Sequence, residues 1–247
     1  MNQRRLFLAI GIIVLAVVVI GIGGFVYIYA TGGSGKASAP ISAPALVAND
    51  ASQRHFQIDP SGSNVQFTLT EVLMGNPNTV VGKTNQVAGD ILVDADQPSN
   101  SQIGKLRIDA RTFATDSPMR DRMIRGPILA SGQNQYEYID FVPSGITGLP
   151  SKIEAGQSYT FQVTGNMTVR DITKPVTFDV TAKLVAGSPD QLEGTATTTV
   201  KRADFNLQIP NVATVANVSD AVKLEIDFVA PEAGASSTAT QAATTSS

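Results

Sequence analysis

Residues 159–184 read YTFQVTGNMTVRDITKPVTFDVTAKL, and their alternation is the strongest structural signal in the chain. From Tyr159 to Val169 the odd positions are apolar or Gly, while the even positions between them carry Thr, Gln or Asn. A period of two sorts side chains onto the two faces of a β-strand. After a turn predicted at Asp171–Lys174, the apolar residues occupy even positions up to Leu184. The pattern predicts a long antiparallel hairpin whose apolar face must be covered, because a lone hairpin is unstable in water.

Similar alternation predicts further strands on both sides of this hairpin. They fall at residues 55–59, 64–69, 79–94, 105–110, 136–142, 191–205 and 222–228. Within the long 79–94 strand, Gly82 and Gly89 mark positions where a curved strand bends or bulges. About eight strands joined mostly by short turns predict an all-β domain, either an antiparallel barrel or a sandwich.

One segment departs from the strand pattern and predicts a short helix. The sequence DSP at 116–118 combines a capping side chain with Pro at the first helical position, and GP at 126–127 predicts the end. Between them, Met119, Met123 and Ile124 fall on one helical face. An apolar helical face within an all-β domain is typical of a plug or lid over one end of a barrel.

The N-terminal part of the chain predicts a membrane anchor. Residues 6–30 form an uncharged apolar run after Arg4 and Arg5. At about 1.5 Å per residue, a helix of this length crosses a hydrocarbon core of about 30 Å. We expect residues 1–30 to be a cytoplasmic stub and an uncleaved signal anchor, with everything after them outside a bacterial cytoplasmic membrane. The alternative is a cleaved signal peptide, whose apolar core usually spans about 7–15 residues.

Composition divides the rest of the chain into three parts. Residues 31–52 are rich in Gly, Ser, Ala and Pro, which predicts a flexible linker. Residues 231–247 are mainly Ala, Ser and Thr, which predicts a disordered tail. One folded domain is therefore expected over residues 53–230.

Composition also argues against several classes of function. The chain has no Cys, which excludes disulfides, thiolate nucleophiles and Cys-ligated zinc. A net charge of -3 gives no basic stripe for nucleic acid. The single His, His55, has no nucleophile motif around it and is expected at a surface or a strand edge. The carboxylates of Asp90, Asp94, Asp96 and Asp109 are expected in solvent. We therefore expect a binding protein that is not an enzyme and has no metal or cofactor.

The interior of the expected barrel is either filled or hollow. Eight-stranded barrels fill their interior with side chains or keep room for one ligand. Many facing positions carry Thr, Ala or Gly, and the soft side chains of Met119, Met123 and Met167 favour a cavity. The alternative left open is a structural or adhesion β-sandwich with a filled core and a protein partner.

Five segments together carry a resemblance to a known family. GNMTVRDITKPV at 165–176 is similar to the signature G-x-L-T-I-x-G-V-T-K-P-V of the YceI-like polyisoprenoid-binding family. The segments 56–67, 120–121, 201–205 and 218–222 resemble, in the same order, its opening strands, its Arg-Asp motif, its R-x-D-F-G strand end and its closing segment. The similarity spans nearly all of residues 53–230.

Three residues depart from the pattern of this family. Asp171 and Asn206 stand where it usually has Gly, and both residue types tolerate a left-handed backbone better than most. Thr84 stands in place of an aromatic residue, and the stretch before Tyr136 lacks the paired Phe of the family. We expect these losses to widen or reshape the tunnel mouth.

The resemblance implies an elongated, eight-stranded, lipocalin-like barrel around a hydrophobic tunnel. It also implies that the tunnel holds a polyisoprenoid chain of the quinone or prenyl phosphate type. Together with the predicted anchor, it suggests a membrane-tethered protein that carries or sequesters this lipid. Protein partners, and whether the chain forms a dimer, stay open.

The expected tunnel lining comes from the inward positions of the strands and the apolar face of the helix. It comprises Phe67, Leu69, Ile91, Val93, Leu106, Ile108, Met119, Met123, Ile124, Phe161, Val163, Met167, Phe178 and Val180. An ordinary packed core is the alternative for each of them. Arg120 is the candidate for a contact with a polar headgroup; the alternative is a pairing with Asp121 or with a backbone carbonyl.

Overall fold

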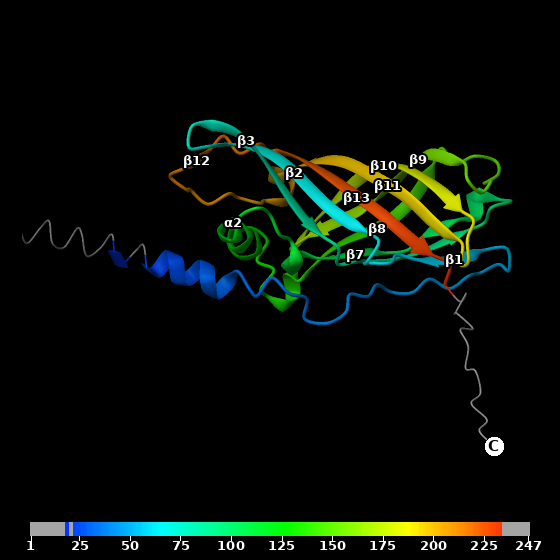
Figure 1. Cartoon of the computed structure of the whole chain (residues 1–247), viewed down its shortest axis with the longest axis horizontal. Coiled ribbons are helices and arrows are strands. Elements are labelled where there is room, and N and C mark those ends of the chain that lie inside the picture. The colour runs from blue at the N-terminus through cyan, green and yellow to red at the C-terminus, as the bar shows by residue number, and fades with distance from the viewer. Residues whose placement is uncertain (1–17, 20–21, 234–247) are drawn as a thin grey trace, which may run out of the picture.

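The computed structural model describes residues 18–19 and 22–233 of the chain (Figure 1). Most of the predicted anchor and nearly all of the predicted tail lie outside these residues. Residues 22–31 are helical. Within the described ranges, no helix is both long and apolar enough to cross a membrane.

The described chain has an all-β fold built around one large antiparallel sheet. Nine strands follow one another in the order β3-β2-β13-β11-β10-β9-β8-β7-β4 and curl into a nearly closed barrel (Figure 1). They are β2 (Asn64–Leu73), β3 (Asn76–Thr84), β4 (Val87–Ala88), β7 (Leu106–Asp109), β8 (Tyr138–Thr147), β9 (Ser158–Val169), β10 (Ile172–Val185), β11 (Gln191–Lys201) and β13 (Ala221–Pro231). The barrel confirms one of the two predicted architectures, and the sandwich alternative was wrong.

Smaller elements complete the fold. A second sheet pairs β1 (Arg54–Gln57), β5 (Asp90–Val93) and β6 (Gln102–Ile103), and the short β12 (Val215–Ala216) pairs with β2. Besides the helix at residues 22–31, the helical elements are η1 (Pro98–Asn100), η2 (Ala110–Thr112), α2 (Pro118–Met123), η3 (Ile124–Ile128), η4 (Asn134–Tyr136) and η5 (Arg202–Phe205).

The prediction of a single strand over residues 79–94 was wrong. The chain divides there into β3, β4 and β5, and β5 leaves the barrel to join the second sheet. Gly89 lies at the second break, where a Cβ would come within 2.4 Å of Cδ2 of Leu106. This division gives the barrel nine strands where about eight were expected.

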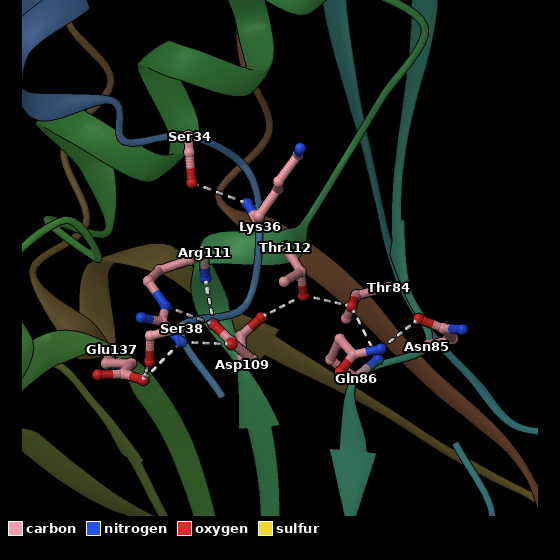
Figure 2. A network of polar contacts seen from close by, with 10 residues as sticks. All are labelled: Ser34, Lys36, Ser38, Thr84, Asn85, Gln86, Asp109, Arg111, Thr112 and Glu137. Carbon is pink, nitrogen blue, oxygen red and sulfur yellow. Dashed lines mark hydrogen bonds and ion pairs between the residues drawn. The ribbon is translucent and has the colours of Figure 1, made fainter. Parts of the chain in front are cut away.

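A polar seam joins the end of β3 to residues 112–114, which follow β7 (Figure 2). Lys83 and Ala114 exchange two backbone hydrogen bonds of 2.9 and 3.0 Å. Beside them, the hydroxyl of Thr84 contacts that of Thr112 at 2.5 Å, and Thr112 donates to the backbone carbonyl of Asp109 at 2.8 Å. Thr84 thus helps to close the wall and lines neither of the cavities described below, and the effect of the missing aromatic residue on the mouth stays a prediction.

The central hairpin confirms the opening pattern. β9 and β10 pair in an unbroken register in which Val163 lies opposite Phe178, and both side chains are buried. The turn was expected at Asp171–Lys174 but occupies only Arg170 and Asp171. Arg170 adopts the left-handed backbone, with φ of 57°, and Asp171 does not. At Asn206, the other position where the family usually has Gly, the backbone is left-handed, with φ of 50°.

Large rings inside the barrel lie over glycines of neighbouring strands. Phe67 is paired with Gly82, where a Cβ would come within 2.2 Å of the ring. Phe141 lies similarly over Gly165, where a Cβ would meet the ring at 2.7 Å and the carbonyl oxygen of Val142 at 2.5 Å. Glycine at these positions makes room for an aromatic side chain on the inner face of a curved wall.

The predicted short helix is present, and its start is confirmed. The Ser117 hydroxyl accepts a hydrogen bond from the Arg120 backbone N–H, and Pro118 occupies the first turn. The carboxylate of Asp121 accepts from both the N–H and the hydroxyl of Thr115 at 2.7 Å, which fixes the chain before the helix. The predicted stop was too early, because the π-helical turn η3 carries the chain past Pro127 to Ile128.

The predicted linker runs along the outside of the barrel (Figure 1). After residue 31 it has no helix or strand up to β1. The Ser38 hydroxyl donates to Glu137 at 2.8 Å (Figure 2), and the Leu46 N–H donates to Asp90 at 3.0 Å. The linker therefore connects the helix at one end of the barrel to the first strand at the other.

Candidate functional site

The barrel encloses two cavities with apolar walls. The larger has a volume of about 620 Å³ and lies under α2, and the smaller, of about 110 Å³, lies near the second sheet. Phe141, Phe178 and Ile226 line both cavities. The two rings meet edge to face, with centroids 5.1 Å apart and planes at 73°. We call these three residues the septum, because they lie where the two spaces adjoin.

Every residue of the expected tunnel lining lines one of the two cavities. The larger cavity contains Phe67, Leu69, Ile108, Met119, Met123, Ile124 and Met167, together with Phe178. The smaller cavity contains Ile91, Val93, Leu106, Phe161, Val163 and Val180, together with Phe178. The expected lining is thus distributed over two adjoining cavities that share the septum residues. That these side chains contact a ligand stays a prediction.

Further lining residues were not predicted. Phe141 on β8 and Leu224 on β13 occupy inward positions of strands whose alternation was visible in the sequence. The alternation of apolar residues along these two strands would have predicted that Phe141 and Leu224 face the interior. Leu207, Ile209 and Val212 belong to the irregular segment 206–214, which has no periodicity from which an inward face can be read.

Arg120 lies in the wall of the larger cavity, within a group of charged side chains. It forms ion pairs with Glu71, at 3.1 Å, and with Asp116. The expected structural partners, Asp121 and a backbone carbonyl, were wrong. Glu71 also accepts from the side-chain amide of Asn78 at 2.9 Å. A headgroup that approached Arg120 would therefore meet a guanidinium already held by two carboxylates.

Three of the four carboxylates expected in solvent are buried. Asp90, Asp94 and Asp109 are 2% exposed or less, because each accepts hydrogen bonds that replace water. Asp90 lies 3.0 Å from Nε2 of His55, which is on the edge of the second sheet. Asp109 receives two side-chain hydrogen bonds from Arg111, at 3.0 and 2.7 Å (Figure 2). These groups fasten loops and strand ends and do not point into either cavity.

Arg125 is the buried cation nearest to the N-terminal helix. Its Nε donates to the carbonyl of Gly32 at 3.0 Å and its Nη1 to that of Phe113 at 3.0 Å. Burial lowers the pKa of Arg125, which no carboxylate contacts directly. Among the described residues, no group of three His, Asp or Glu side chains is arranged to hold a metal ion.

Three solved structures of bacterial proteins are similar in fold to this chain. BcnA of Burkholderia cenocepacia is 22% identical, with a TM-score of 0.52 over 70% of this chain and 98% of its own. A polyisoprenoid binding domain from Saccharophagus degradans, implicated in plant cell wall breakdown, is 12% identical, with a TM-score of 0.55 over 72% and 98%. The YCEI protein of Campylobacter jejuni is 16% identical, with a TM-score of 0.50 over 61% and 84%. At these identities the likeness shows the fold alone.

The sequence itself identifies the family. No curated protein matches the chain. The family model of the YceI-like domain matches residues 56–230, which cover the barrel, α2 and the second sheet. The protein belongs to the family of YceI-like domains.

Proposed function

We propose that this protein binds a polyisoprenoid chain, of the quinone or prenyl phosphate type, in the larger cavity and carries or sequesters it. The observation behind this proposal is the apolar space of about 620 Å³ inside a YceI-like barrel. The solved domain from Saccharophagus degradans described as polyisoprenoid binding has the same fold. The cavity also argues against the alternative of a structural or adhesion domain, because such a domain is expected to have a filled core.

The physical basis of binding is burial of the hydrocarbon chain. Each CH₂ group removed from water contributes about 0.8 kcal/mol, so a few isoprene units give substantial affinity without polar contacts. At the larger cavity, Glu71 and Ser117 contact Arg120 near α2 and form one polar group, while Phe67, Met167 and Leu224 supply apolar wall. A ligand would therefore place its chain toward the septum and its polar end toward Arg120.

We also propose that the barrel lies outside a bacterial cytoplasmic membrane and is attached to it by its N-terminal segment. The support is the uncharged run of residues 6–30 behind Arg4 and Arg5. The positive residues favour a cytoplasmic N-terminus, which places the barrel on the other side.

Native mass spectrometry of the full chain, released from membranes in detergent, tests the binding proposal. We expect a stoichiometric apolar adduct that organic extraction recovers and denaturation releases. Leu69→Asp places a carboxylate in the larger cavity and should abolish the adduct, whereas Thr70→Asp, on the exposed side of the same strand, should retain it. A folded wild-type chain that carries no lipid and does not take up an added long-chain quinone would overturn the proposal.

A further inference from the structure

The rim of the larger cavity exposes apolar side chains from three separate elements. Met74, at the tip of the β2–β3 hairpin, is 74% exposed; Met119 of α2 is 44% exposed and Val212 is 37% exposed. Met119, Val212 and the neighbour of Met74, Leu73, line the cavity. Figure 1 shows this hairpin, the β12 loop and α2 together at one end of the barrel. We call Met74, Met119 and Val212 the rim.

The helix at residues 22–31 extends the same apolar surface outward. Ile28 lines the larger cavity, so this helix forms part of its wall. Other side chains of the helix are exposed, including Ile22, Phe25, Val26 and Tyr29. An apolar surface therefore continues from inside the cavity, through Ile28, onto the exposed helix. A continuous exposed apolar surface of this kind marks an interaction site.

The end of this helix is fixed to the barrel. Arg125 holds the carbonyl of Gly32, and a Cβ at Gly32 would come within 2.9 Å of Cβ of Arg122. The guanidinium of Arg122 lies 4.0 Å from the ring centroid of Tyr29, a cation–π contact. The helix is thus held beside the rim by specific contacts.

The path of the linker determines which end of the barrel lies beside the helix. A free linker would allow either end of the barrel to face the anchor. Here residues 33–52 return along the barrel to β1, held by hydrogen bonds to Glu137, to Asp90 and, from Ser52, to Asp94 at 2.7 Å. The first strand therefore starts at the end remote from the helix, and the rim lies next to it (Figure 1).

We propose that the rim docks on the surface of a lipid bilayer, so that the isoprenoid passes between bilayer and cavity beside residues 22–31. This inference rests on the proposed lipid binding and adds the surface through which the lipid enters. The occupant is a bilayer because the exposed apolar helix at residues 22–31 belongs, up to residue 30, to the uncharged run of residues 6–30 in the sequence. Met, Val, Phe and Tyr side chains suit the boundary between headgroups and acyl chains.

Single-cysteine labelling of the full chain in liposomes tests the docking directly, since the protein has no Cys of its own. An environment-sensitive fluorophore is attached to M74C, V212C or, as a control, A155C. Ala155 is exposed in the loop that also contributes Ile153 to the smaller cavity, at the other end of the barrel. We expect brominated lipids to quench the label at M74C and V212C and to leave A155C unchanged.

Two results would overturn the docking. One is quenching at M74C no greater than at A155C. The other is an unquenched but blue-shifted label at M74C together with cross-links between copies, which would assign the rim to a second copy of the chain.

A loading experiment separates docking from lipid binding itself. Met74 does not line the cavity, so M74E should slow uptake of a long-chain quinone from liposomes several-fold and leave the amount bound at saturation unchanged. A155E is the matched control and should load at the wild-type rate. Equal rates for M74E and A155E would contradict the docking, whereas no quinone bound by any variant would instead refute the proposed function.

Discussion

The two ends of the barrel differ in how their apolar interior is closed. At the rim end, α2 and the irregular segment 206–214 cover a cavity of about 620 Å³. At the other end, the second sheet packs under the wall and only about 110 Å³ remains. Strands with the same alternation line both spaces. The two spaces therefore differ in the elements that close their ends.

The closure of the smaller cavity is well packed and held by charge. Phe56 of β1 and Leu92 of β5 are completely buried. Arg54 forms ion pairs with Asp190, in the β10–β11 turn, at 2.8 Å and with Glu232, after β13, at 2.5 Å. The end of the barrel covered by α2 is not closed by paired strands. We therefore expect a ligand to enter and leave at that end.

The largest effect should come from removing a ring of the septum, where the two spaces adjoin. Phe178→Ala deletes one ring of the edge-to-face pair, and we expect a loss of about 3–5 kcal/mol in the free energy of unfolding. It should also join the cavities, so that longer isoprenoid chains are recovered. Urea denaturation measures the first effect, and mass spectrometry of extracted lipid measures the second.

Phe161→Ala provides the matched control for this prediction. Phe161 lines only the smaller cavity, so its loss should also destabilise the barrel but leave the septum in place. The same distribution of chain lengths in both variants would show that the septum does not limit the ligand.

A smaller loss in the free energy of unfolding is expected at Gly165, where the wall has no space for a side chain. Gly165→Ala would press its Cβ against the Val142 carbonyl and the Phe141 ring of the septum. Overpacking of this kind costs about 1–3 kcal/mol. Gly145→Ala, where no atom lies within 4 Å, is the control and should unfold close to wild type in the same denaturation assay. Equal stability of the two variants would mean that the wall can move aside at Gly165.

The ion pairs at the smaller cavity should make stability depend on pH. The hydrogen bond and charge of Arg54 hold the pKa of Glu232 below its usual range, against the effect of burial. A lowered pKa adds stability that is present above the unfolded value, near 4.3, and is lost as pH falls through the folded pKa. Arg54→Gln should therefore cost about 1 kcal/mol at pH 7, since the pair is partly exposed.

The difference between wild type and Arg54→Gln should then narrow as the pH falls below 4. Thermal unfolding at pH 7 and pH 3 measures it. A difference of the same size at both values would assign the effect to packing of the Arg54 side chain over Phe56, whose ring centroid is 5.2 Å away, and not to charge.

The smallest effect is expected on the outer face of the wall, which belongs to neither cavity. The hydroxyls of Thr164 and Thr177 contact across β9 and β10 at 2.9 Å. A cross-strand pair of this kind contributes about 0.2–1 kcal/mol, so Thr164→Ala should lower stability by at most this amount. The amount of bound lipid should not change. Altered lipid content in this variant would show that the outer face also takes part in binding.

The sequence predicted those features that repeat locally. The β9–β10 hairpin, the cap at Ser117 and the inward side of every predicted lining residue follow from spacing over a few neighbouring positions. Arg120 was placed at the cavity, but its partner Glu71 lies on β2, far from α2 in the sequence. Local periodicity carries no information about such a pair.

The same limit applies to the seam, the septum and the linker. Thr84 and Thr112 meet because two distant edges of the wall come together. Phe141 and Phe178 belong to β8 and β10, which are separated by β9 in the sheet, so the spacing of residues along either strand does not predict their contact. The composition of the linker predicts a flexible segment. It does not predict hydrogen bonds between the linker and the barrel, such as that from Leu46 to Asp90.

The position of β13 has a consequence for how the chain folds. This last strand lies between β2 and β11, and its Leu224 pairs with Phe67 near the start of the domain. The wall therefore stays open until the end of the domain has been synthesised. Folds dominated by such distant pairings fold slowly, over milliseconds to seconds. During this interval the apolar inner faces of β9 and β10 are exposed to solvent, and such surfaces make a partly folded chain prone to aggregation.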